Sequence, residues 1–198
     1  MKDTALSLNE RIAQRVRELR AEQELSLEEL AERSGVSRSM ISLIERAETS
    51  PTAVVLEKLA AAFGVVLSTL FEAPTSSARE KPSPLVRHAE QVVWKDPDTG
   101  YVRRNVSPPG FPQPFQIVEV HFPPGARVVF DNASRHRPAT QQIWVLEGTI
   151  ELTVGKERHK LQDGDCLAMR LDRPISFHNR TRHTARYAVV IATERFSR

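Results

Sequence analysis

The sequence predicts an α+β protein of two domains, an all-α domain over residues 1–72 and an all-β domain over residues 85–198. In the first part, apolar residues recur at the spacing of amphipathic helices. In the second part they come in short runs separated by turns, as in a sandwich or barrel of strands. The two parts are separated by a polar segment, residues 73–84, which contains three prolines and three serines. We expect this segment to be a linker.

Composition excludes several classes of protein. The chain has 198 residues, 40% hydrophobic and 27% charged, which are ordinary values for a globular protein. Its single cysteine, Cys166, excludes an intrachain disulfide and fits a reducing compartment. The first residues do not form a secretory signal, and no segment approaches the ~20 apolar residues of a membrane span. We therefore expect a cytoplasmic protein without a membrane partner.

Local signals mark the first helices. Four apolar residues share one face of the first helix: Leu8, Ile12, Val16 and Leu19. The motif SLEE, in which Ser26 is followed three residues later by Glu29, is a capping box that begins a second helix. In the turn SGVS, Gly35 suits a left-handed conformation and Ser37 is a cap for the next helix.

Two further helices are expected before the linker. Ser50 is the predicted cap of a fourth helix, with Pro51 at its first position. The sequence VVLSTLF, residues 65–71, predicts a last short helix.

Two short helices joined by a tight turn that contains glycine form the helix-turn-helix pattern, whose second helix enters the major groove of DNA. By spacing, Met40, Ile41 and Ile44 take the core-facing side of this second helix. The residues left for its outer side, and expected to contact DNA, are Ser37, Arg38, Ser39, Ser42 and Arg46. Arg38 is placed to reach a guanine edge or a phosphate, and Arg46 a phosphate. The alternative is an ordinary solvated face on a small helical domain.

Residues 9–72 resemble the helix-turn-helix of the XRE (phage-repressor-like) family of bacterial regulators. The residues that match its pattern are Ala31, Gly35, Val36, Ser37, Ile41, Ile44, Glu45, Arg46 and Pro51. The chain departs from it at Ala47, where a glycine is usual and alanine is expected to stiffen the helix end slightly. It also departs at Ser42 and Leu43, which leaves the base preference open. The resemblance implies that Glu45 pairs with an arginine of the first helix, for which Arg20 is the candidate.

The all-β part resembles the cupin family over residues 86–194. GARVVFDNASRHRPATQQIWVLEGTIELTVG, from Gly125, is similar to the first cupin motif, and GDCLAMRLDRPISFHN, from Gly164, is similar to the second. The resemblance implies a double-stranded β-helix barrel with a central pocket. The complete expectation is an N-terminal helix-turn-helix bundle followed by a C-terminal cupin barrel, an arrangement that recurs among bacterial regulators.

A metal-bearing cupin typically supplies three histidines and one glutamate, and this chain lacks most of them. The corresponding positions hold Ser134, His136, Gln141 and Ile175. Only His136 is a donor of the expected kind, because a neutral glutamine binds divalent metals poorly and isoleucine not at all. We therefore expect no metal and no other cofactor.

Other catalytic groups are weak candidates, so we do not expect an enzyme. His178 or His183 would be a substitute ligand, but His178 is expected to face a loop. Cys166 is interpreted as a small hydrophobic residue of a strand. A nucleophile pair of Ser134 and His136 is not favoured, since alternate residues of any strand share a face.

The barrel pocket is still suited to a small ligand. Strand alternation puts Gln141, Ile143 and Val145 on one face. The predicted ligand-binding residues are Ser134, His136, Gln141, Ile143 and Ile175. Residues 75–198 carry a net charge of +6 and residues 1–74 one of −3, and arginines crowd near the pocket: Arg127, Arg135, Arg137, Arg170 and Arg173. This favours an anionic effector such as an amino or carboxylic acid, although non-specific DNA contact is an alternative use of the charge.

These observations predict a transcriptional regulator that binds a roughly palindromic double-stranded DNA operator as a homodimer. Its barrel would bind a small-molecule effector that changes the affinity for DNA. Three alternatives remain open at this point: a cupin isomerase or dioxygenase fused to a DNA-binding domain, a ligand-independent repressor whose barrel only dimerises, and an antitoxin.

Overall fold

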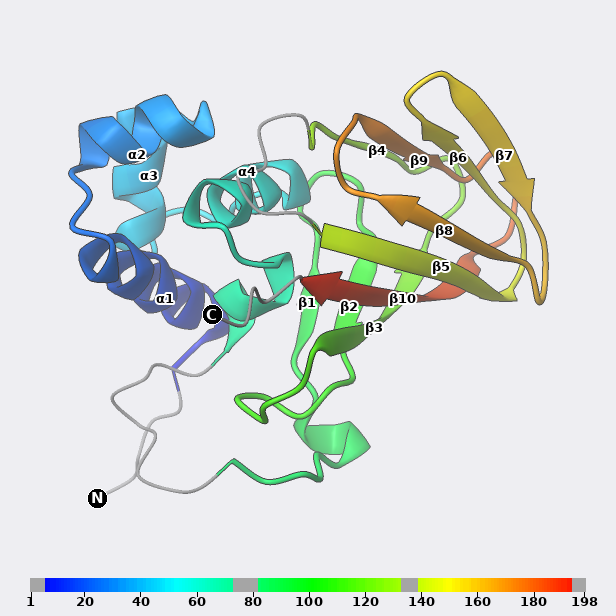
Figure 1. Ribbon diagram of the computed structural model, residues 1–198, viewed down its shortest axis with the longest axis horizontal. Helices are drawn as coiled ribbons and strands as arrows, with labels where there is room; N and C mark the ends of the chain where they lie inside the picture. Colours follow the sequence, from blue (N-terminus) through cyan, green and yellow to red (C-terminus); the bar gives the residue numbers. More distant parts are fainter. Residues whose placement is uncertain (1–5, 73–81, 133–138, 194–198) are drawn as a thin grey trace.

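The computed structural model describes residues 6–72, 82–132 and 139–193, which form a helical part and a β part packed side by side (Figure 1). The helices are α1 (Leu8–Glu22), α2 (Leu27–Ser34), α3 (Arg38–Glu45), α4 (Ala53–Phe63) and the 3-10 helices η1 (Leu67–Phe71) and η3 (His88–Glu90). The strands are β1 (Val93–Lys95), β2 (Val102–Asn105), β3 (Phe115–Phe122), β4 (Arg127–Phe130), β5 (Ala139–Glu147), β6 (Ile150–Val154), β7 (Glu157–Leu161), β8 (Cys166–Arg170), β9 (Ile175–His178) and β10 (Ala185–Thr193). The predicted α+β class is confirmed.

The helix starts follow the local signals in the sequence. Ser26 and Glu29 form the predicted capping box before α2. Gly35 ends that helix in the left-handed conformation, with φ at 64°. The Ser37 hydroxyl then accepts a hydrogen bond from the Met40 amide at 3.2 Å and begins α3. No helix in the described ranges is long and apolar enough to cross a membrane.

The start of α4 differs from the prediction. Thr52, not Ser50, is the cap, and the helix begins at Ala53. The Ser50 hydroxyl instead accepts a hydrogen bond from the Asn9 side chain at 2.7 Å, and Pro51 is buried ahead of the helix. The expected cap was wrong because a residue distant in the sequence holds the Ser50 side chain.

The strands form two antiparallel sheets, one with the order β1-β2-β3-β10-β5-β8 and one with the order β4-β9-β6-β7. Gly148 turns the chain from β5 in the first sheet to β6 in the second with φ at 88°. A Cβ atom there would lie 3.2 Å from the Thr184 carbonyl oxygen and from the Ala185 Cα. A larger residue would therefore meet both a backbone clash and a strained conformation.

Residues of β5 alternate between the inside and the outside of the β part. Gln141, Ile143 and Val145 are buried on the inner face, as predicted, whereas Trp144 is 51% exposed on the outer face. The inner face of the first sheet lies opposite the inner face of the second, and the core of the β part is between them.

The helical and β parts share one continuous hydrophobic core. The Phe71 ring of η1 lies 5.6 Å from the Trp94 ring of β1, and Trp94 lies 5.8 Å from Tyr101. The Ala53 amide at the start of α4 donates to Asp96 Oδ1, beyond β1, at 2.8 Å. Figure 1 shows α4 between helices α1–α3 and the strands. Most of the predicted linker, residues 73–81, lies outside the described residues, but the parts it joins are in direct contact.

Candidate functional site

Helix α3 has one buried face and one polar face. Ile41 and Ile44 are fully buried against the helical core. On the opposite face, the residues predicted to read DNA are exposed or half-buried: Ser37, Arg38, Ser39, Ser42 and Arg46. The structure therefore brings all five to one end and side of the domain.

Both arginines of this polar face already have carboxylate partners. Arg38 Nε lies 2.6 Å from Glu28 Oε1 of α2, and both side chains are 65% exposed. Arg46 binds Glu48 through two hydrogen bonds of 2.8 and 2.9 Å and also contacts the Ser42 hydroxyl. Exposed pairs of this kind are worth little, so the arginines can exchange these partners for phosphate or base edges.

A partly buried ion pair joins α3 to α1. Arg20 Nε donates to Glu45 Oε1 at 2.7 Å, and Arg20 Nη2 donates to Oε2 at 2.9 Å. The same guanidinium donates to the Leu25 carbonyl at 2.9 Å. The hydrogen bonds that Arg20 donates to Glu45 raise the pKa of Arg20. The pair that the family resemblance implied is confirmed.

Ala47 ends α3 in the left-handed conformation, with φ at 58°. Its amide donates to the Ile44 carbonyl, and the Glu48 amide donates to the Leu43 carbonyl, at 2.9 and 3.0 Å. A left-handed L-residue costs roughly 1–2 kcal/mol. Ala47 thus takes the backbone conformation in which glycine is usual, and the slight stiffening of the helix end stays a prediction.

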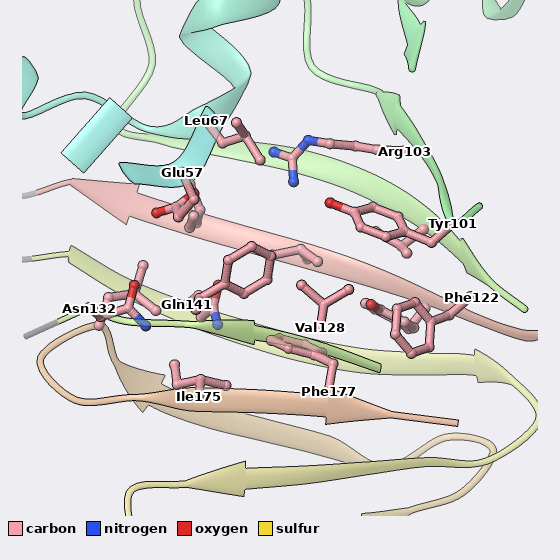
Figure 2. Close-up of a pocket in the computed structure, with 16 residues that line it drawn as sticks. Glu57, Leu67, Tyr101, Arg103, Phe122, Val128, Asn132, Gln141, Ile175 and Phe177 are labelled. Carbon is pink, nitrogen blue, oxygen red and sulfur yellow. The ribbon is translucent and has the colours of Figure 1, made fainter. Parts of the chain in front are cut away.

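A cavity of about 60 Å³ lies between the two sheets and is closed on one side by the helical part (Figure 2). Most of its wall is apolar, including Phe122 and Val128. Leu67 of η1 and Glu57 of α4 line it from the DNA-reading domain. A ligand in this cavity would therefore touch both domains.

The structure places the predicted ligand-binding residues in different surroundings. Gln141 and Ile175 line the cavity. Ile143 is fully buried on the same face of β5 but does not contribute to the cavity wall. Ser134 and His136 lie outside the described residues. Asn132 also lines the cavity, and it is the last described residue before that gap.

The cavity residues that the sequence reasoning missed include two helical residues and two residues in and beside β2: Glu57, Leu67, Tyr101 and Arg103. Tyr101 and Arg103 lie two residues apart in and beside β2, both buried, and alternate with less buried neighbours. This alternation appears only in the structure, because in the sequence Arg103 is followed directly by Arg104 and no pattern shows which of the two faces inward. For Glu57 and Leu67, no motif indicates that helical residues reach a β-sheet cavity.

Arg103 is the charged group buried deepest in this cavity, with 7% of its surface exposed. Its Nη2 donates to the Ser68 hydroxyl of η1 at 2.8 Å, whereas its buried Nε has no hydrogen-bond partner among the described residues. Desolvation by burial lowers the pKa of Arg103, and electrostatic interactions with Tyr101, Glu57 and Tyr187 oppose that shift. Within the described ranges, no salt bridge joins Arg103 to a carboxylate.

The two described residues at the cupin metal positions, Gln141 and Ile175, do not fit a metal. The Gln141 amide donates to the Met169 sulfur at 3.4 Å, and Ile175 has no donor atom. The described ranges contain no group of three His, Cys, Asp or Glu side chains arranged to hold a metal ion. His178 does not face a loop as expected, because it belongs to β9, on the face opposite the buried Phe177.

Two expectations for surface residues need correction. Cys166 is on β8, as predicted, but it is exposed and does not pack as a core residue. The arginines expected near the pocket are on the surface where they are described: Arg127, Arg170 and Arg173. Arg135 and Arg137 lie outside the described residues. The positive charge within the cavity comes instead from Arg103.

Comparisons with known proteins identify both domains. Residues 16–70 match the helix-turn-helix family and residues 118–191 match the cupin domain family. The HTH-type transcriptional regulator SutR of Escherichia coli (strain K12) is 26% identical over 178 residues, covering 89% of this chain and 91% of SutR. The regulator PuuR of the same organism is 29% identical over 181 residues, covering 90% of this chain and 91% of PuuR.

A solved structure shares the whole fold. The crystal structure of an HTH_3 family transcriptional regulator from Vibrio cholerae has a TM-score of 0.77 at 24% identity, covering 95% of this chain and 98% of that one. The order of the two matched domains agrees with the order of the helical and β parts. The chain therefore combines an XRE-type helix-turn-helix domain with a C-terminal cupin domain, and over about 90% of its length it is similar to HTH-type transcriptional regulators.

Proposed function

We propose that this regulator binds a roughly palindromic operator as a homodimer in the cytoplasm, and that its barrel cavity binds a small molecule that changes operator affinity. The observation that carries the proposal is the cavity wall, to which the DNA-reading domain contributes Glu57 and Leu67. A molecule bound there contacts α4, which packs against α2, the helix that precedes the reading helix. Linkage then requires its affinity to differ between the free and DNA-bound protein if it shifts operator affinity.

In this proposal the polar face of α3 contacts DNA through Ser37, Arg38, Ser39, Ser42 and Arg46. Arg38 and the serines near the helix start face base edges and backbone, and Arg46 faces a phosphate. The fixed orientation of α3, held by the pair of Arg20 and Glu45, supports this role because base recognition needs a defined helix position.

The outer face of the first sheet is the proposed dimer interface. Trp144 is 51% exposed and Phe115 is 44% exposed on that face. Apolar side chains of this size are typically covered in a stable assembly. A dimer would present two α3 helices spaced about one helical turn of DNA apart, ~34 Å.

The proposed ligand site contains Gln141 and Ile175, together with Ser134, His136 and Ile143 as predicted contributors. Regulation is favoured over catalysis because a metal-dependent cupin reaction needs donors that Gln141 and Ile175 do not supply. Metal analysis of protein purified without chelator separates the two: one equivalent of tightly held metal per chain would favour the cupin enzyme.

The experiment has two stages. An operator is first selected from random duplexes and its affinity measured at fixed salt. A metabolite screen by thermal shift then supplies candidate ligands, and operator titration is repeated with each. The variant Gln141→Trp should fill the cavity and abolish the ligand effect, while DNA binding without ligand survives. If no metabolite both stabilises the protein and changes operator affinity, the barrel is a dimerisation module and the sensor proposal is wrong.

A further inference from the structure

We propose that the effector is a small carboxylic acid whose carboxylate binds Arg103, and that this contact weakens the docking of the DNA-reading domain on the barrel. The inference rests on the proposed function, and adds the chemical class of the ligand and the route by which it acts.

Arg103 is a buried cation that has no salt bridge to a carboxylate among the described residues. A buried cation is normally paired with an anion or fully hydrogen-bonded, because its desolvation is costly. Arg103 is almost fully buried, its Nε has no hydrogen-bond partner among the described residues, and its Nη2 donates to a neutral hydroxyl. A carboxylate matches the planar guanidinium with two parallel hydrogen bonds. The cavity thus has a specific place for one organic acid group.

The rest of the cavity wall is mostly apolar. Its apolar side chains can contact the hydrocarbon part of a ligand, but they cannot bind inorganic sulfate or phosphate. They include Phe122, Val128, Phe177 and Ile175. The volume of about 60 Å³ has room for roughly four to six water-sized groups, at about 10–15 Å³ each. The expected ligand is therefore a short-chain organic acid.

The last argument concerns the coupling between the domains. Arg103 belongs to β2 and donates to Ser68 of η1, so it connects the barrel to the DNA-reading domain. Glu57 of α4 lines the same cavity, and its negative charge stabilises the charged form of Arg103. A bound carboxylate would compete with Ser68 for the guanidinium and bring a second negative charge towards Glu57. Both effects reduce the attraction between the barrel and the reading domain.

Propionate is the probe, and propionamide is its neutral counterpart of equal size. Chloride is added so that the ionic strength is the same in every titration. Binding to the full chain is measured by calorimetry. Propionate should bind at least tenfold more tightly than propionamide and than sulfate. Arg103→Met should abolish that preference, and Glu57→Gln should strengthen propionate binding several-fold because a like charge is removed. Arg127→Met is the matched control: Arg127 is exposed on β4, beside the cavity residue Val128, and its loss should change nothing.

The coupling is read from operator titrations. Propionate should change the operator affinity of the wild-type protein and of Arg127→Met at least threefold, and leave that of Arg103→Met unchanged. Removing a buried charge that has no salt bridge among the described residues is not expected to unfold the protein. Should Arg103→Met unfold nevertheless, the comparison of propionate with propionamide and the effect of Glu57→Gln still decide the matter.

The outcomes separate this inference from the function on which it rests. Equal binding of propionate and propionamide, no measurable binding of propionate, or unchanged propionate binding by a folded Arg103→Met would overturn the inference. The proposed function would survive if another metabolite shifted operator affinity. Failure of the wild-type protein to bind any selected operator would instead refute the function itself.

Discussion

Asp96 joins the β part to the first turn of α4, and its replacement by alanine is expected to destabilise the protein by roughly 2–4 kcal/mol. Its Oδ1 accepts from the Ala53 amide at 2.8 Å, and its Oδ2 accepts from the amide and the hydroxyl of Thr99 at 2.8 and 2.6 Å. The side chain is 2% exposed. Alanine would leave the Ala53 amide buried without an acceptor, which costs about 1–3 kcal/mol. It would also remove a negative charge from a helix start, worth about 0.3–1 kcal/mol.

The assay is urea unfolding of the wild-type protein and of two variants, followed by circular dichroism. Asp98→Ala changes an exposed aspartate of the same turn and should stay within about 0.5 kcal/mol of wild type. A loss below about 0.5 kcal/mol for Asp96→Ala, or a loss equal to that of Asp98→Ala, would show that the contact with α4 does not hold the two parts together.

Three other predictions follow from the sites. Arg38→Ala should weaken specific operator binding by about 1–3 kcal/mol if Arg38 contacts a base edge; an unchanged affinity at fixed salt would remove it from the reading face. Purified protein should carry well under one equivalent of Zn, Fe, Ni or Mn per chain, because Gln141 and Ile175 replace donors, and elemental analysis near one equivalent would contradict this. Ala47→Gly should raise the free energy of unfolding by about 0.5–1 kcal/mol, since glycine relieves the left-handed strain; a loss of stability in the same urea assay would show that the strain is absent.

Features governed by residues close in the sequence could be predicted. The capping box of Ser26 and Glu29 and the turn at Gly35 involve neighbours within a few positions, so the sequence carries their whole cause. The inward face of β5 could be predicted in the same way, because successive side chains of a strand point to opposite faces. This alternation correctly predicted that Gln141 is buried.

Features that depend on contacts between residues distant in the sequence could not be predicted. The start of α4 was misplaced because Asn9 holds Ser50 and Asp96 holds Ala53, over separations of 41 and 43 residues. The importance of Arg103 was missed for the same reason: its burial and its bond to Ser68 arise only when the helical part closes the cavity. The positive charge of the β part was visible in the sequence, but which arginine faces inward was not.

The aromatic contacts that run from Phe71 through Trp94 and Tyr101 to Phe122 bear on how such regulators diversify. In a chimaera that joins this reading domain to an unrelated barrel at residues 73–84, Phe71 would lose its contact with Trp94. The Ala53 amide would also lose Asp96, its hydrogen-bond acceptor. We therefore expect the two halves to work as a matched pair, in which a substitution on η1 or α4 requires a compensating one on β1 or β2. New effector specificity would arise by changing the cavity wall within an intact chain, not by exchanging the domain that contains it.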